Sequence, residues 1–238
     1  MDNITHSMIG AVLGQAGLKW RTGMAMPALV IGANLPDVDA PCSVYGIESL
    51  AMRGGLSHGP IALIVLPLVL AGLLIAWDRW QARRGKRPPE RLPVHTGWLI
   101  ALCYIGAPSP PLFDWMNTYG IRLLEPFSSR WFYGDALFIV DPWLLAMLVA
   151  GVWLSLRGEN RKALRSPVPA RIAIVAGLAY VAFNIGLSRT VAWRALRDAP
   201  YPQVAVASPV IERVMAEAAL PAVSLDVPAP AADLPTDP

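Results

Sequence analysis

The segment 59–77 constrains the fold most strongly, because it carries no charged side chain over nearly the length of a membrane crossing. A helix rises 1.5 Å per residue, so about 20 apolar residues cross a hydrocarbon core of about 30 Å. The whole chain is 55% hydrophobic and 16% charged. Soluble domains average about 25% charged residues, so we expect a protein embedded in a lipid bilayer.

Five further apolar segments accompany this one. Three are long and cover 93–113, 136–156 and 172–188, and two shorter ones cover 3–18 and 22–36. The two short segments reach only about 22–24 Å as helices, which fits thin spans, tilted re-entrant helices or a buried hairpin. We therefore predict an all-α polytopic membrane protein with four transmembrane helices and two short N-terminal membrane helices.

The domain organisation follows from a change in composition near the end of the chain. Residues 1–197 are predicted to form one membrane-embedded domain, and the Ala/Pro-rich residues 198–238 a disordered tail. The first residues lack a basic stretch, so no signal peptide is expected. Cys42 and Cys103 do not indicate a disulfide framework, since Cys103 lies in an apolar run.

Two basic loops, 78–92 and 157–171, set the expected orientation. The positive-inside rule places both loops in the cytoplasm, where they would contact anionic lipids rather than nucleic acid. Alternation of the spans then brings six ionisable residues to the opposite, periplasmic face: His6, Asp37, Asp39, His58, Asp114 and Asp141. Two imidazoles among several carboxylates match the ligands of a divalent ion, with Zn²⁺ or Mn²⁺ as the expected cofactor.

Asp37 and Asp39 follow Pro36, which disfavours helical geometry at Leu35. If the chain is extended beyond this proline, residues i and i+2 point to the same side. Asp37 and Asp39 would then act together as ligands of one metal ion or of a pair. The alternative interpretation is a solvated turn rich in Asn, Pro and Asp.

Several short motifs occur in an order that resembles the YdjM-like family of bacterial inner-membrane, metal-dependent hydrolases. The matching stretches are residues 4–10, 34–39, 53–59, 109–120, 125–134 and 141–143. The resemblance implies an inner-membrane location and metal-ligand positions at His6, Asp37, Asp39, His58 and Asp114. The family usually has a histidine four residues before the last aspartate, where this chain has Pro110. A site short of one ligand could bind the metal more weakly, recruit a water molecule or be inactive.

The remaining candidates have competing structural interpretations. Asp141 could act as a general base, but Pro142 follows it, and an N-cap with proline at the first helical position is the favoured interpretation. Asn117 could contact substrate or satisfy backbone groups. His95 adjoins a basic loop on the cytoplasmic face and is excluded from the site.

Two arginines, Arg122 and Arg130, are predicted on the same face as the acidic cluster, against the charge bias of membrane proteins. Each could bind a phosphate or carboxylate group through its guanidinium. The alternative is a salt bridge to Glu125 or Asp135.

These observations together predict a membrane-bound hydrolase that acts at the periplasmic membrane face. A metal-activated water would attack a phosphoester, or with less support an ester or amide, in a substrate that could be lipid-linked. Two alternatives stay open. The chain could be a catalytically impaired relative because of Pro110, or a transporter that uses the acidic cluster. The charges lie at the ends of the spans rather than in their middle, which disfavours a transporter.

Overall fold

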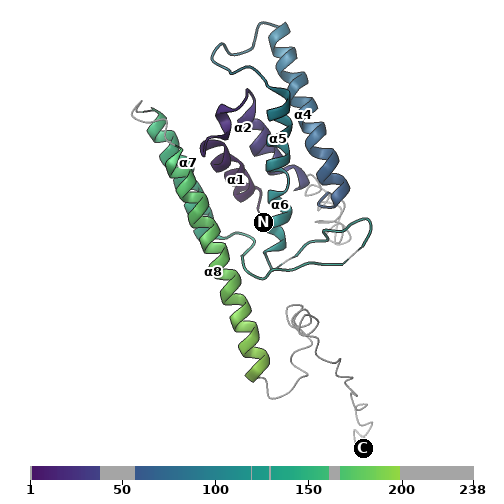
Figure 1. Ribbon diagram of the computed structural model, residues 1–238, viewed down its shortest axis with the longest axis vertical. Helices are drawn as coiled ribbons and strands as arrows, with labels where there is room; N and C mark the ends of the chain where they lie inside the picture. Colours follow the sequence, from purple (N-terminus) through teal and green to yellow (C-terminus); the bar gives the residue numbers. More distant parts are fainter. Residues whose placement is uncertain (1, 38–56, 119, 129, 161–166, 199–238) are drawn as a thin grey trace, which may run out of the picture. The chain divides into compact units, whose positions relative to one another are not determined.

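The computed structural model describes residues 2–37, 57–118, 120–128, 130–160 and 167–198. Helices dominate these residues, which confirms the all-α prediction (Figure 1). The predicted ligand Asp39 and residues 199–238 of the predicted tail lie outside the described residues. The contacts divide the chain into the units Met1–Arg189 and Thr190–Pro238, and everything below concerns the first unit, except for the last turns of α8.

The chain begins with α1 (Asn3–Gln15), the 3-10 helix η1 (Leu18–Trp20) and α2 (Ala25–Gly32). Asp2 starts α1, because its carboxylate accepts hydrogen bonds from the backbone N–H groups of Ile4 and Thr5 at 3.0 and 2.9 Å. Gly10 lets α1 approach α2 closely, since a Cβ there would lie 2.5 Å from the Leu29 carbonyl oxygen. The small-residue pattern of α1 thus serves helix packing.

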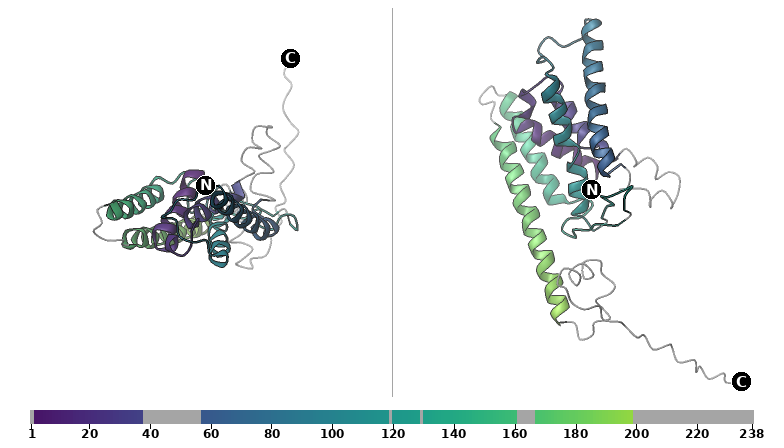
Figure 2. Two further views of the ribbon diagram at one scale, coloured as in Figure 1. Left: turned by 90° about the horizontal axis from the view of Figure 1, so that it is seen from above. Right: turned by 45° about the vertical axis from the view of Figure 1, so that its right-hand side comes forward.

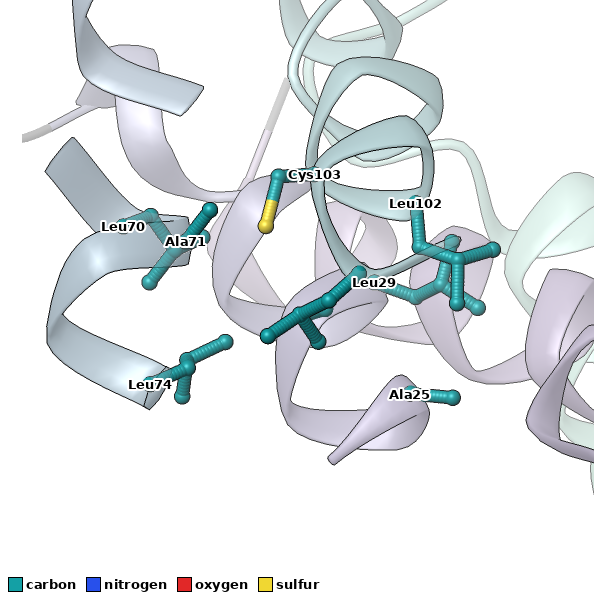
Figure 3. Packing of buried hydrophobic residues seen from close by; sticks show 9 residues of the cluster. Ala25, Leu29, Leu70, Ala71, Leu74, Leu102 and Cys103 are labelled. Atoms are coloured by element: carbon teal, nitrogen blue, oxygen red, sulfur yellow. The ribbon is translucent and has the colours of Figure 1, made fainter. Parts of the chain in front are cut away.

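Helix α2 packs against both α4 (Pro60–Arg83) and α5 (Thr96–Gly106). Helices α4 and α5 run side by side in Figure 1 and in the right-hand view of Figure 2. Figure 3 shows Leu29 of α2 between these two helices. The other labelled members of this core are Ala25, Leu70, Ala71, Leu74, Leu102 and Cys103. This close packing fixes the position of α2, whose end leads directly to Asp37.

Helix α1 also contacts α7 (Pro142–Asn160), so it lies between two apolar cores. The second core joins α1 and α7 to α8 (Val168–Asp198) and contains Ile9, Val12, Leu144, Leu148, Ala173 and Val181. The helix that carries His6 is therefore held on two sides.

The predicted set of four spans is supported in part. Among the described residues, the helices long and apolar enough to cross a membrane are α4, with a mean hydropathy of 2.5, and the stretch Val168–Ala195 of α8, with 1.7. Large apolar side chains on both helices are exposed, including Ile64, Leu73, Ile172, Val175 and Phe183, as expected for lipid-facing surfaces. Helix α7 begins at Pro142 and, with 19 residues, reaches about 29 Å.

The predicted span 93–113 is interrupted in the structure. Helix α5 ends at Gly106 after 11 residues, or about 17 Å, and a separate helix α6 follows at Ser109–Trp115. Pro108, Pro110 and Pro111 explain the break, because proline lacks the N–H that would continue the α5 hydrogen bonds. As a result of this break, Asp114 lies in the separate short helix α6.

The predicted cytoplasmic segments are joined to one another. Lys19 forms a salt bridge with Glu159 at the end of α7, and Arg171 donates a hydrogen bond to the Ala16 carbonyl at 3.1 Å. Thr22 accepts a hydrogen bond from the backbone N–H of His95 at 2.7 Å. The region after α1 thus contacts the ends of the basic loop 157–171 and the residue His95 that follows the other basic loop, while His6 lies at the opposite end of α1.

Candidate metal centre

Four ionisable side chains from distant parts of the sequence meet in one buried cluster. His6 lies in the first turns of α1, Asp37 follows α2, His58 directly precedes α4, and Asp114 lies in α6. His6 is 0% and His58 2% exposed, and both carboxylates are largely covered. We refer to His6, Asp37, His58 and Asp114 as the His/Asp cluster. The sequence predicted all four as members of one site.

The cluster alternates imidazole and carboxylate. His6 Nε2 lies 3.6 Å from Asp37 Oδ2 and 3.5 Å from Asp114 Oδ1. His58 Nε2 lies 3.4 Å from Asp37 Oδ1 and 3.5 Å from Asp114 Oδ2. Each carboxylate therefore directs one oxygen to each imidazole.

These spacings are long for hydrogen bonds, which are usually about 2.7–3.2 Å for N–H···O. His6 Nε2, His58 Nε2 and Asp37 Oδ2 are buried and make no hydrogen bond within the described residues. Such an atom costs about 1–3 kcal/mol when it stays unsatisfied. A tetrahedral ion with ligands at about 2.0–2.2 Å holds neighbouring ligand atoms about 3.3–3.6 Å apart. The cluster therefore has the donor atoms and the spacing of a site for a divalent cation.

The protonation of Asp37 suits metal binding. Burial raises the pKa of this carboxyl group, but the neighbouring imidazoles of His58 and His6 outweigh that effect and hold the pKa below its ordinary value of 3.8. Asp37 is thus ionised at neutral pH, as a metal ligand must be.

Polar neighbours hold the ligands in place. Asn34 donates a hydrogen bond to Ser7 Oγ at 3.0 Å and another to the Val30 carbonyl at 2.8 Å. It thereby joins the helix of His6 to the turn that carries Asp37. Ser57 Oγ lies 3.1 Å from His58 Nδ1, the ring nitrogen that faces away from the carboxylates. Asn34 and Ser7 could not be identified as positioning residues from the sequence, since their contact joins separate segments.

The backbone at Asp37 differs from the prediction. Helix α2 ends at Gly32, before Pro36, and residues 35–37 form a 3-10 turn in which the Asp37 N–H donates to the Asn34 carbonyl at 3.1 Å. The expectation of an extended chain at Asp37 is therefore wrong. A turn is favoured because the Asn34 side chain caps the end of α2 and Pro36 has no N–H for an α-helical bond.

Asp141 lies in a different environment from the His/Asp cluster. Its Oδ1 accepts a hydrogen bond from the Leu144 N–H at 3.0 Å, and its Oδ2 accepts one from the Tyr180 hydroxyl at 3.0 Å. The N-cap interpretation is confirmed. Oδ1 caps α7 and Oδ2 connects the start of α7 with α8, whereas the role of Asp141 as a general base stays a prediction.

Replacing Asp141 with alanine tests its role as the N-cap of α7. We expect the free energy of unfolding to fall by about 1–2 kcal/mol, because α7 loses its N-cap. Tyr180→Phe should produce a smaller loss of about 1 kcal/mol. Thermal unfolding and metal analysis on the same samples test this. A loss of metal from Asp141→Ala at unchanged stability would instead place Asp141 in the metal centre.

The predicted substrate contacts occupy structural positions. Asn117 is buried, and its Oδ1 accepts a hydrogen bond from the Gly120 N–H at 3.3 Å. Arg122 forms the alternative salt bridge, with 3.4 Å between its Nη1 and Glu125 Oε2, and its guanidinium lies 5.2 Å from the Trp131 ring centroid. The guanidinium of Arg130 lies over Phe132 at 5.7 Å.

Pro110 is buried in the first turn of α6, four residues before Asp114. Its position would place a histidine on the same helix face as Asp114. The His/Asp cluster nevertheless assembles from four other side chains without a ligand from this position.

One comparison with known proteins gives a match. The model of the family described as YdjM inner membrane protein matches residues 1–191. No curated protein and no solved structure matches the chain. The matched range contains every residue of the His/Asp cluster.

Proposed function

Because the chain belongs to the YdjM inner membrane protein family, we propose that it is a metal-dependent hydrolase that acts at the periplasmic face of a bacterial inner membrane. The observation that carries this proposal is the alternation of His6, Asp37, His58 and Asp114 around buried donor atoms that lack hydrogen bonds. A divalent ion, Zn²⁺ or Mn²⁺, would supply a water molecule of lowered pKa and a positive charge for the substrate oxygen. Asp39, outside the described residues, is proposed as a further ligand.

A phosphoester is the substrate class that the side chain of Arg122 supports best. Arg122 Nε is buried and makes no hydrogen bond within the described residues, while the Nη1 atom of the same side chain pairs with Glu125. This guanidinium retains a donor for an anionic oxygen. The ring of Trp131 orients it and restricts its motion.

A lipid-linked substrate fits the exposed apolar side chains of the segment between α6 and α7. Phe127 is 76% exposed and Phe138 71%, and Trp143 at the start of α7 is 70% exposed. Aromatic side chains are favoured at membrane interfaces. A substrate held in the bilayer by its apolar part could reach a centre at this level without leaving the lipid.

The proposal is tested by assaying the purified full chain with phosphoesters of lipids in detergent micelles. Hydrolysis is expected with Mn²⁺ or Zn²⁺, and it should stop after removal of the metal by a chelator and return on its re-addition. Chelator-resistant hydrolysis, or no hydrolysis with any divalent ion, would contradict the proposal. The same assay on Pro110→His tests the impaired-relative alternative, which requires activity in that variant alone.

Substitution of Arg122 with glutamine should affect substrate binding. We expect a fall in kcat/KM of about 10- to 100-fold for a phosphoester, since a charge-assisted hydrogen bond contributes about 1.5–3 kcal/mol. The change should reside mainly in KM, and metal content should stay constant. Arg84→Gln is the matched control, because Arg84 also lies over a tryptophan, Trp80, at 4.9 Å, but at the far end of α4. Equal kcat/KM for the two variants would remove Arg122 from the substrate site.

A further inference from the structure

We propose that the His/Asp cluster holds two divalent ions, with both carboxylates bridging them. This inference rests on the proposed metal centre and extends it by a second site. Its basis is the way in which the four side chains share their atoms. One three-atom set consists of His6 Nε2, Asp37 Oδ2 and Asp114 Oδ1, with spacings of 3.6 and 3.5 Å from the imidazole. The other set consists of His58 Nε2, Asp37 Oδ1 and Asp114 Oδ2, at 3.4 and 3.5 Å.

The two sets have no atom in common, although they use the same two carboxylates. A single ion would draw one oxygen from each carboxylate and both imidazoles to one point. In the structure, ligand atoms of His6, Asp37 and Asp114 lie within 4.8 Å of one another, which is close enough for them to hold one ion. His58 faces the remaining oxygens of the same carboxylates instead. This arrangement favours one ion beside each imidazole.

Burial strengthens the case for a ligand on each side. Both imidazoles are almost completely inaccessible, and Nε2 of each makes no hydrogen bond within the described residues. One ion beside His6 would leave His58 Nε2 buried and without a hydrogen bond in the part of the chain that the structure describes. A second ion satisfies His58 Nε2 and uses the carboxylate oxygens that face it.

Charge balance indicates what a two-ion centre would bind. The carboxylates of Asp37 and Asp114 contribute two negative charges, which balance one divalent ion bound with neutral imidazoles. A second divalent ion leaves an excess of two positive charges in a buried site. Hydroxide and an anionic phosphoryl oxygen would neutralise this excess, which agrees with a phosphoester substrate and is the usual use of paired metal ions.

The number of bound ions tests this inference. The purified wild-type chain, loaded with Mn²⁺ and dialysed, should contain two equivalents of manganese by elemental analysis. Its electron paramagnetic resonance spectrum should show a spin-coupled pair. His6→Ala and His58→Ala should each retain one equivalent and show an isolated ion. Asp37→Asn should lose both, because an amide cannot provide two anionic oxygens.

Asp78→Asn is the matched control, since Asp78 is also a buried carboxylate but pairs with Arg87 and Arg91 at the far end of α4. It should keep both equivalents. Circular dichroism of the metal-free proteins shows whether each variant folds. One equivalent in the wild type, or two in His58→Ala, would overturn the two-ion centre while leaving the proposed hydrolase intact. Absence of any bound metal in the wild type would overturn both.

Discussion

The Asp37→Asn protein is expected to lose its hydrolytic activity and to bind divalent ions at least about 100-fold more weakly than the wild type. Even partners that only orient metal ligands contribute about 10- to 100-fold to affinity, and Asp37 is itself a predicted ligand. Its two oxygens lie 3.6 and 3.4 Å from the two imidazoles. The substitution keeps the size of the side chain but removes its negative charge, so the loss should reflect chemistry rather than packing.

Titration calorimetry with Mn²⁺ and the phosphoester assay measure the two effects. Thermal unfolding of the metal-free protein shows whether the variant remains folded, which separates a lost ligand from a lost fold. Asp78→Asn again serves as the control for removing a buried carboxylate. Wild-type affinity and activity in Asp37→Asn would show that this aspartate is not a ligand.

The second large effect is expected from Gly10→Ala, which should destabilise the protein by about 3 kcal/mol. A Cβ at Gly10 would lie 2.5 Å from the Leu29 carbonyl oxygen and 2.8 Å from the Val30 Cα, both of which belong to the backbone of α2. Overpacking a core costs about 1–3 kcal/mol, and a rigid backbone neighbour places this case at the upper end. Helix α1 must therefore move away from α2.

This movement of α1 should also change the distances between the ligands of the metal centre. His6 lies one turn before Gly10 on α1, while Asp37 follows α2, so a wider separation of the helices moves one ligand away from another. We expect weaker metal binding together with a lower unfolding temperature in detergent.

Gly72→Ala is the control for the glycine substitution. Nothing lies within 4 Å of a Cβ at Gly72, and alanine favours a helix by up to about 1 kcal/mol over glycine. This variant should unfold at the wild-type temperature or slightly above it. Similar unfolding temperatures for the two alanine variants would contradict the close contact between α1 and α2.

The residues of the site were predictable because a few basic loop residues determine the expected orientation of the chain in the membrane. Lysine and arginine in the loops are sufficient to assign His6, Asp37, His58 and Asp114 to one face, and the structure brings these four together. The resemblance to the YdjM-like family selected the same residues from their motifs. Loop charges and motif order describe segments rather than atoms, so neither could show that each carboxylate faces both imidazoles.

Local geometry was less predictable. The apolar run 93–113 gives no composition signal for its division into α5 and α6, and the three prolines at its end could equally have terminated a full span. The Asn34 side chain that caps α2 before the turn at Asp37 also bonds to Ser7, a contact between α2 and α1 that the local sequence does not indicate. Asp141 lies at the predicted helix start, but its partner Tyr180 follows 39 residues later.

The most direct test of the metal centre is X-ray absorption at the zinc edge of the purified, zinc-loaded chain. The account predicts a first shell of nitrogen and oxygen alone at about 2.0–2.2 Å, with the outer-shell scattering of imidazole rings. The His6→Ala and His58→Ala proteins should each lose either half of the zinc per chain or half of the imidazole scattering per zinc. A sulfur shell at about 2.3 Å would contradict the assignment of the zinc to the His/Asp cluster. The same holds if both variants keep the wild-type zinc content and the wild-type imidazole scattering per zinc.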